Sequence, residues 1–378
     1  MAINTISSIE TPCVLLDKSR LQDNIHRIQK IADAQHVNVR PHIKTHKCLE
    51  ILQLQDEVGA VGITTSKTDE ALTFINNGVQ SVTVAYPLVV DSKLDRLIAT
   101  SSSRQVDLRL TLDSPYGLEM ITRVAKRHGK KINIFLKIDV GLHRCGVAED
   151  DPLVLELVKA IQEESCLNFA GLLSHAGHAY GAATSDQVRQ IARDEYQILN
   201  RVQEKLEKNQ IEVKEISVGS TPTILVNENY DGITEIRPGN YVFMDRTPLR
   251  LGLIQHQHIA LSVLATVVSI NPEYFIIDAG SKVLSSDQGA HGIAGMEGYG
   301  LAYPVDRFDD LSYEMTVLKL SEEHGFVARR NFDLPIGSMI RINPNHSCAV
   351  ANLADFYTIV NDDQMIDRWK IIARGKVH

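Results

Sequence analysis

Short runs of β-branched and apolar residues alternate with helical segments across residues 11–248, and this alternation constrains the fold more than any other feature of the chain. Strands that alternate with helices form parallel βα units, and eight such units close a (β/α)8 or TIM barrel within about 250 residues. We therefore predict an α/β fold with an N-terminal (β/α)8 TIM barrel, with an open doubly wound sheet as the alternative. The predicted strands cover residues 37–40, 61–64, 81–85, 106–111, 132–140, 169–174, 215–218 and 234–237.

Two helices are indicated most clearly around these strands. Residues 17–34 form the first, ahead of the first strand. In the second, residues 185–208, apolar residues recur at helical spacing along one stripe, and Ser185 is placed to cap the N-terminus.

The pattern changes after about residue 250. Apolar runs are then separated by glycine-rich turns, with no long helical period, which is typical of a mainly β domain. The sequence predicts a barrel over residues 11–248 and a second, C-terminal mainly-β domain made of residues 1–10 and 249–378. Residues 280–300 are rich in glycine and serine and are expected to form a long, functional loop.

The composition is that of an ordinary globular protein, with 378 residues, 44% hydrophobic and 23% charged. The 39 basic and 47 acidic residues give a net charge of −8 without a basic block, which argues against nucleic-acid and polybasic membrane partners. Residues 259–270, the longest apolar run, are too few to span a bilayer, and residues 1–10 lack a signal-peptide pattern. Five scattered cysteines indicate reduced thiols, so we expect a cytoplasmic enzyme.

Reactive side chains follow several predicted strands, at the face of a barrel where active sites are built. Lys44 lies in the basic segment 40–47, where a desolvated lysine has a lowered pKa and forms a Schiff base. A solvated basic turn that opens the next helix is the alternative. Arg144, in the glycine-flanked segment 139–146, either reaches a ligand oxygen or lies on the surface.

Two histidines and two glycine turns complete this set. We expect at least one of His175 and His178 to be functional, without choosing between them. Thr221 is placed as an N-cap with Pro222 at the first helical position, and free N–H groups at a helix start bind phosphate. A plain capped helix is the alternative there. The Pro-Gly pair at 238–239 is either a second phosphate-facing wall or an ordinary type II turn.

His346 and Cys348 form a candidate metal pair in the second domain. In an extended segment residues i and i+2 point the same way, so both side chains would grip one ion. Imidazole with thiolate favours zinc, and two protein ligands leave the open positions that a catalytic zinc needs. A buried thiol beside a turn histidine is the alternative.

Taken together, these segments resemble the fold-type III pyridoxal-phosphate enzymes, the alanine-racemase-like class, and within it the D-serine dehydratase and D-threonine aldolase group. The resemblance implies a barrel that holds pyridoxal 5'-phosphate, a β domain that supplies a metal, and a homodimer. The matching motifs run in the family's order along nearly the whole chain, at residues 40–47, 139–146, 174–181, 217–223, 237–241 and 343–348.

The resemblance also implies individual roles. Lys44 binds the cofactor covalently, Arg144 contacts its phenolic oxygen, and His175 lies against its pyridine ring. His346 and Cys348 match the metal pair of the dehydratase branch, whereas the aldolase branch more often has aspartate at the second position. The residues implied in cofactor binding on the phosphate side are Tyr180, Ser220, Thr221, Gly239, Asn240 and Tyr241.

The implied function is a lyase that acts on D-amino acids with a β-hydroxyl. In a dehydratase acting on D-serine or D-3-hydroxyaspartate, Lys44 takes the α-proton and Zn²⁺ helps the hydroxyl to leave, giving a keto acid and ammonia. In an aldolase, with His175 or His178 as base, the products are glycine and an aldehyde. A racemase needs a second base, for which no tyrosine stands out, and a non-catalytic cofactor-binding protein would have little use for the β domain.

Overall fold

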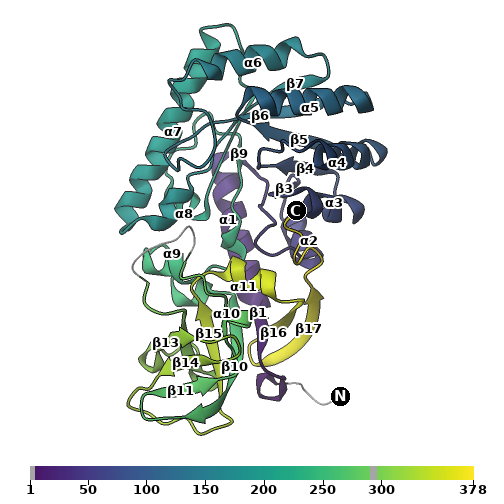
Figure 1. The fold of residues 1–378 in the computed structure, drawn as a ribbon. Helices are drawn as coiled ribbons and strands as arrows, with labels where there is room; N and C mark the ends of the chain where they lie inside the picture. The colour runs from purple at the N-terminus through teal and green to yellow at the C-terminus, as the bar shows by residue number, and fades with distance from the viewer. Residues whose placement is uncertain (1–4, 290–295) are drawn as a thin grey trace.

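A parallel eight-stranded sheet forms the N-terminal part of the protein in the computed structural model, which describes residues 5–289 and 296–378 (Figure 1). Its strands lie side by side in the order β2-β9-β8-β7-β6-β5-β4-β3. The edges meet where Thr64 N–H donates to the Pro41 carbonyl at 2.8 Å and Ile43 N–H donates to the Thr64 carbonyl at 3.0 Å. The strands are β2 (Asn38–Val39), β3 (Ile63–Thr65), β4 (Ser81–Val84), β5 (Asp107–Leu112), β6 (Ile132–Lys137), β7 (Leu167–Leu173), β8 (Glu215–Val218) and β9 (Glu235–Ile236).

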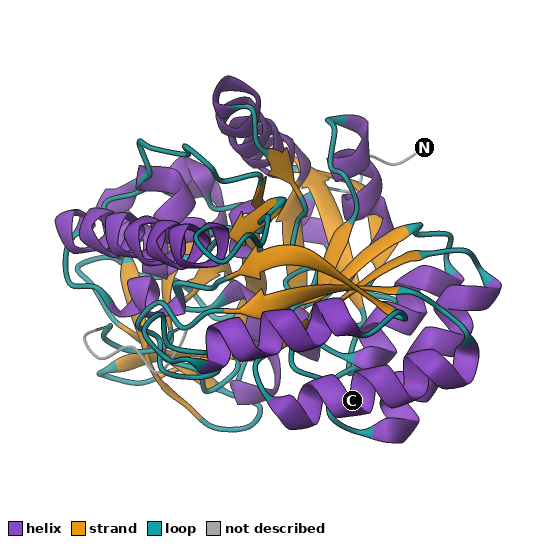
Figure 2. Cartoon of the chain, turned by 90° about the horizontal axis from the view of Figure 1, so that it is seen from above, coloured by secondary structure: helices purple, strands orange, loops and turns teal. Residues whose placement is uncertain are grey.

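Helices follow the strands and cover the outside of this curled sheet, as Figure 2 shows from above. Local sequence explains their ends: in α5, Ser114 accepts a hydrogen bond from Gly117 N–H, Pro115 opens the helix and Gly129 ends it in the left-handed region. The helices are α1 (Lys18–Gln35), α2 (Leu49–Glu57), α3 (Thr68–Asn76), α4 (Asp91–Ser103), α5 (Pro115–His128), α6 (Leu153–Glu163), α7 (Ser185–Glu207) and α8 (Thr221–Val226).

The long predicted helix is confirmed as α7, which buries Val188, Leu199 and Leu206 on one face. Its predicted cap is wrong by one residue. Thr184, not Ser185, is the N-cap, because its hydroxyl accepts from the Gln187 N–H and leaves Ser185 inside the first turn.

A nine-stranded sheet forms the second domain, in the order β11-β14-β13-β12-β15-β10-β1-β16-β17. Strand β1 pairs antiparallel with β10 and parallel with β16, so the chain leaves this sheet only after Asp17 and enters the barrel with α1, not at residue 11. The strands are β1 (Cys13–Asp17), β10 (Leu261–Ile270), β11 (Tyr274–Ile277), β12 (Gly300–Pro304), β13 (Met315–Leu320), β14 (Gly325–Ala328), β15 (Met339–Pro344), β16 (Phe356–Asn361) and β17 (Gln364–Lys370). The predicted α/β fold, with a barrel and a separate β domain, is confirmed.

Three short helices belong to the remaining part of the chain: α9 (Arg246–Arg250), α10 (Ser281–Leu284) and α11 (Ser347–Leu353). Helix α10 replaces the start of the loop predicted for residues 280–300, of which residues 290–295 lie outside the described part. Helix α11 lies between the barrel and the second sheet (Figure 1). One continuous apolar core connects the domains, with the rings of Phe243 and Tyr357 packed edge to face at 5.4 Å.

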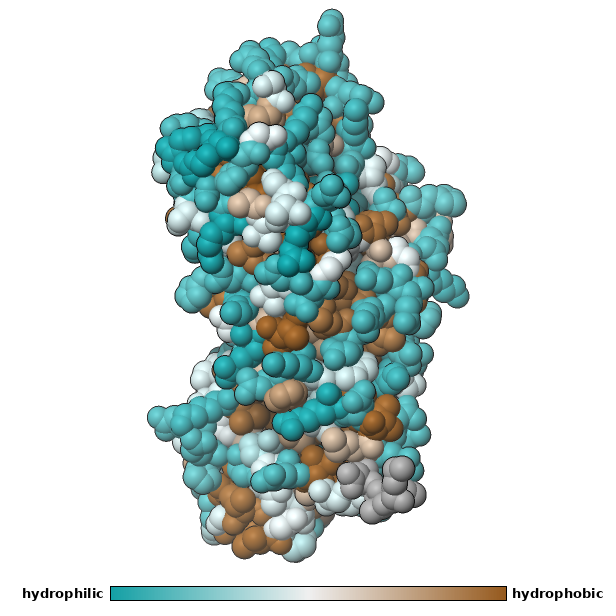
Figure 3. Space-filling model, turned by 90° about the vertical axis from the view of Figure 1, so that its right-hand side faces the viewer, coloured by the Kyte–Doolittle hydropathy of each residue, from teal (hydrophilic) through white to brown (hydrophobic). Residues whose placement is uncertain are grey.

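The surface is mixed. The face shown in Figure 3 is mostly hydrophilic, with apolar residues in small separate groups, as is normal for globular proteins. Among the described helices, none combines the length and the apolar character that crossing a bilayer requires.

Candidate active site

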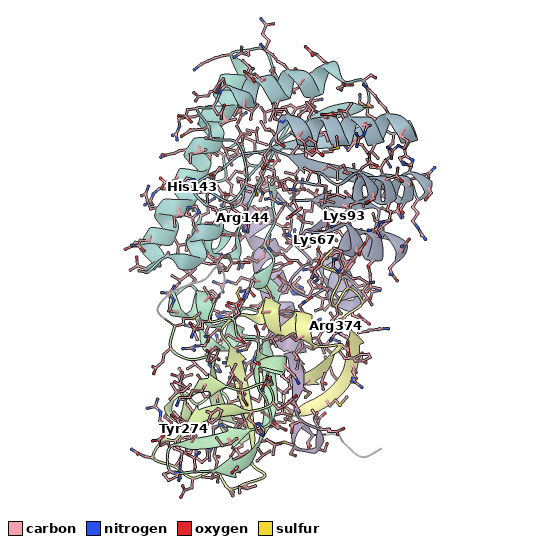
Figure 4. All side chains as sticks on the ribbon, viewed as in Figure 1. Lys67, Lys93, His143, Arg144, Tyr274 and Arg374 are labelled. Atoms are coloured by element: carbon pink, nitrogen blue, oxygen red, sulfur yellow. The ribbon has the colours of Figure 1, made fainter. Side chains whose placement is uncertain are left out.

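Residues that follow the barrel strands and residues of the second domain line one cavity of about 430 Å³. An adjoining cavity of about 570 Å³ shares Lys44, His175 and Arg237 with it and extends to Arg144. Figure 4 places Arg144 and Lys67 at the end of the barrel that faces the second domain. The predicted residues that line the first cavity are Lys44, His175, Tyr180, Ser220, Thr221, Gly239, Asn240, His346 and Cys348.

Two of the candidate residues lie elsewhere. The side chain of Tyr241 is buried outside both cavities, where its hydroxyl accepts a hydrogen bond from Gln55 at 2.8 Å. His178 also lies outside them and packs against Gly141. Of the two candidate histidines, the geometry therefore favours His175.

Lys44 is the amine at the junction of the two cavities. Burial lowers its pKa, and the positive charges of Arg144 and Arg237 act in the same direction, while Cys348 and Glu70 oppose them. A lowered pKa raises the fraction of neutral amine, which is the form that attacks a carbonyl or takes up a proton.

The ring of His175 is held in one orientation. Its Nδ1 lies 2.6 Å from the carbonyl oxygen of Gly219, so this nitrogen donates a proton to that oxygen. Burial and the nearby charge of Lys44 hold the pKa of His175 well below its usual range, which keeps the ring neutral. A Cβ on Gly177 would lie 2.8 Å from its Nε2, so only glycine fits beside this ring.

Arg144 lies on a turn that Asp139 shapes. The Asp139 carboxylate accepts from the backbone N–H groups of Gly141 and His143, at 3.1 and 3.0 Å. Gly146 closes the turn with a φ of 118°, in the left-handed region that favours glycine. The turn directs Arg144 into the second cavity, as the sequence suggested for a ligand-facing arginine.

The predicted phosphate segments meet at the wall of the first cavity, with a different capping pattern from the expected one. Ser220, not Thr221, is the N-cap of α8 and forms a capping box with Thr223. Sequence could not separate two adjacent hydroxyl residues, both good caps. Thr221 Oγ1 instead accepts from Tyr241 N–H at 3.1 Å, which joins the two predicted segments.

Gly239 does not form the alternative type II turn, because its φ of −119° lies outside the left-handed region that such a turn requires. It begins the 3-10 turn η3 (Asn240–Val242) instead. A Cβ there would lie 2.9 Å from Thr45 Oγ1, so the glycine lets the backbone approach the lysine segment.

His346 and Cys348 face each other across the start of α11. The expectation of an extended segment is wrong: His346 precedes the helix and Cys348 lies in its first turn, which still brings the two groups together. Burial opposes ionisation of Cys348, but His346 and a hydrogen bond to Thr45 outweigh it and lower the pKa of the thiol. The Cys348 thiolate and Asp287 likewise outweigh the effect of burial and raise the pKa of His346.

This pair is chemically a ligand set for a soft or borderline metal ion, a nitrogen with a sulfur. Within residues 5–289 and 296–378, no group of three or more His, Cys, Asp or Glu is arranged to hold a metal ion. The described residues therefore offer His346 and Cys348 as a candidate pair of ligands, and both line the first cavity.

Arg237 lines both cavities but is not among the individual candidate residues that the sequence suggests, although it begins the matching motif at residues 237–241. Its buried guanidinium lines both cavities and donates to the Ser174 carbonyl and to Ser217 Oγ. Burial lowers its pKa to about 10, so it stays charged at neutral pH, with Glu235 and Glu195 as nearby carboxylates. The available signal was the pair of charged residues at alternate positions, Glu235 in β9 and Arg237 directly after it.

Comparison with known proteins gives two matching family models, alanine racemase N-terminal domain over residues 16–247 and putative serine dehydratase domain over residues 260–360. The D-threo-3-hydroxyaspartate dehydratase of Delftia sp. strain HT23 is 31% identical over 97% of this chain and 98% of its own. Its solved structure superposes with a TM-score of 0.89, and a cysteine-to-alanine variant of it has been solved in a metal-free form.

Two further relatives have related activities. The D-serine dehydratase of Dictyostelium discoideum is 32% identical over 97% of each chain. The D-threonine aldolase of Arthrobacter sp. is 30% identical over 98% of this chain and 94% of its own.

Proposed function

The chain belongs to the alanine-racemase-like, fold-type III family of pyridoxal-phosphate lyases that carry a D-serine dehydratase domain, and from this premise we propose that it is a metal-assisted D-amino acid dehydratase. The proposed substrate is 3-hydroxy-D-aspartate or D-serine, converted to a keto acid and ammonia. The observation that carries the choice is Cys348, at the position where the aldolase branch more often has aspartate, beside His346 on the wall of the cavity that also holds the Lys44 amine.

The residues of the two cavities fit pyridoxal phosphate. Thr221, Gly239 and Asn240 would hold the phosphate, Lys44 would bind the cofactor covalently, and His175 and Arg144 would contact the ring. The cavity of about 430 Å³ that these residues line supports this fit, because it offers room for a small cofactor beside the Lys44 amine. When bound, this cofactor withdraws electrons from the α-carbon of an amino acid.

The His346 and Cys348 side chains fit a zinc ion with open positions. When bound, such an ion acts as a Lewis acid on a hydroxyl group. The metal-free form of the Delftia cysteine variant supports a role for a cysteine in metal binding in that relative.

The chain's own groups divide the work. Lys44, with its lowered pKa, takes the α-proton of the bound amino acid as general base. His346 and Cys348 would hold a metal ion that assists departure of the β-hydroxyl, and the neutral His175 would pack against the cofactor ring without adding a charge. Loss of the β-hydroxyl and the α-proton as water leaves an enamine, and a water molecule then hydrolyses its imine form to the keto acid and ammonia.

The charge of the cavity favours an acidic substrate. Lys67 and Lys376 line it, and within the described residues neither forms an ion pair with a carboxylate. Lys67 Nζ instead lies 4.1 Å from the ring centre of Tyr86. A second carboxylate, as in 3-hydroxy-D-aspartate, would find a cationic partner here.

The aldolase reaction is the second candidate, because the Arthrobacter relative is as similar as the dehydratases and the reaction would use the same groups. We further propose a homodimer, as the resemblance implies, and a cytoplasmic location, from five free cysteines. Product analysis separates the two reactions: ammonia and a keto acid identify a dehydratase, glycine and an aldehyde an aldolase.

A further inference from the structure

Asp287 contacts the candidate metal pair from the side of the second domain. Its Oδ2 lies 2.6 Å from Nδ1 of His346, while the His346 side chain also contacts Cys348. The histidine thus lies between a carboxylate and a thiol. This is the arrangement in which a metal-binding histidine uses one ring nitrogen for the ion and the other for an orienting acceptor.

Hydrogen bonds connect the segment that carries Asp287 to the residues just after β15, which include His346. Asp287 itself accepts from the Gly289 N–H at 3.1 Å. Asn345, the residue before His346, donates through Nδ2 to the carbonyls of Gln288 and Gly298, at 3.1 and 2.8 Å. Both described ends of this loop are therefore tied to the residue next to the histidine.

Arg246, at the end of the barrel, forms hydrogen bonds to the same two segments. It donates to Asn345 Oδ1 at 2.6 Å and to the Glu297 carbonyl at 3.0 Å. Asp287 and His346 consequently belong to elements whose relative position is set by four hydrogen bonds through Asn345 and Arg246. These hydrogen bonds hold Asp287 close to His346.

We infer that Asp287 is a positioning residue for the metal centre: it holds the proton of the His346 imidazole on Nδ1 and turns Nε2, with its lone pair, toward the ion shared with Cys348. The carboxylate also makes the imidazole a stronger ligand through its negative charge. This inference rests on the proposed metal site, and it assigns to Asp287, which follows α10, a role in orienting the metal-binding histidine.

The test measures zinc affinity directly, in cofactor-loaded protein stripped of metal, by competition of Zn²⁺ with a chromophoric chelator. We expect Asp287→Ala to weaken Zn²⁺ binding about 10- to 100-fold. Asp287→Asn, which keeps an acceptor but not the charge, should fall between Asp287→Ala and the wild type. Asp333→Ala is the matched control, since Asp333 lies in the same domain with its side chain 89% exposed and only a surface pair with Arg329.

A second readout reports the ring itself. Nitrogen-15 spectra of the zinc-loaded wild type, with labelled histidine, should show His346 protonated on Nδ1, and this proton signal should be lost or shifted in the variants. If Asp287→Ala does not fold, the same two measurements on Asp287→Asn decide the question.

The outcomes separate this inference from the function on which it rests. Equal zinc affinity in the wild type and in Cys348→Ala would contradict the proposed metal site, and the positioning role of Asp287 would fall with it. A large loss in Cys348→Ala beside unchanged affinity in the Asp287 variants would overturn only the positioning role. Binding within about twofold of the wild type counts as unchanged, since that is under 0.5 kcal/mol.

Discussion

The backbone N–H of Ser347 donates a hydrogen bond to Oδ2 of Asp245 at 3.1 Å. Ser347 lies between the two residues of the candidate metal pair, and Asp245 lies at the end of the barrel, so this bond sets the position of the pair relative to the Lys44 cavity. The same carboxylate, fully buried, accepts from Asn240 and from the Thr247 N–H at 2.9 and 3.0 Å.

Replacing this carboxylate should loosen the junction of the domains. In Asp245→Asn, one acceptor oxygen becomes an NH2 group that faces the donors of Ser347 or Thr247, which we expect to cost about 1–3 kcal/mol of unfolding free energy. Urea denaturation measures this value, with the exposed Asp333→Asn as control. Stability equal to the wild type would show that Asp245 does not hold the two domains together.

Removing the Lys44 amine should abolish covalent cofactor binding. We expect Lys44→Ala to lose the absorption band of lysine-bound pyridoxal phosphate and to lose activity by about 10³-fold or more, because the general base is removed as well. Lys44→Arg keeps the positive charge and serves as the control for electrostatics. A variant that keeps the band would contradict the assignment of Lys44.

Removing the Cys348 thiol should abolish metal binding but leave cofactor binding intact. We expect the wild type to retain about one zinc ion per chain and Cys348→Ala to lose it, while the cofactor band stays, because the phosphate side of the cavity is untouched. Metal analysis beside the absorption spectrum measures both. Full activity after exhaustive chelation would rule out the metal-assisted mechanism.

Lys137 gives a prediction about pH. Burial lowers its pKa from 10.5 to about 8, so between these values the unfolded chain binds more protons and the free energy of unfolding rises with pH. Below a pH of about 8 the folded protein buries the charged Lys137 ammonium, and the full desolvation cost lowers the free energy of unfolding. In cofactor-free protein, Lys137→Met should therefore stabilise by about 3 kcal/mol at neutral pH. The gain should vanish as the pH rises through the unfolded pKa, and an equal gain at all pH values in urea denaturation would contradict this account.

The sequence predicted the parts of the structure that depend on local pattern. The eight barrel strands and helix α7 follow from alternation and helical period, which each short segment carries by itself. Adjacent capping residues were exchanged at Thr184 and Ser220, because serine and threonine cap equally well and tertiary packing decides between them.

Long-range contacts could not be predicted, because the patterns in the sequence are local to each short segment. The pairing of β1 with β10 joins residues about 250 positions apart, and no local pattern reveals it. Neither Asp245 nor Asp287 is among the candidate residues that the sequence suggests. Their roles come from partners about a hundred and about sixty residues away.

The most direct measurement of the proposed function is a product analysis of the zinc-loaded holoenzyme with 3-hydroxy-D-aspartate, D-serine and D-threonine in parallel. We predict equal amounts of ammonia and keto acid, fastest with 3-hydroxy-D-aspartate, and none from Lys44→Ala. Glycine with an aldehyde as the main products, or formation of the L-isomer alone, would contradict the assignment of this protein as a dehydratase.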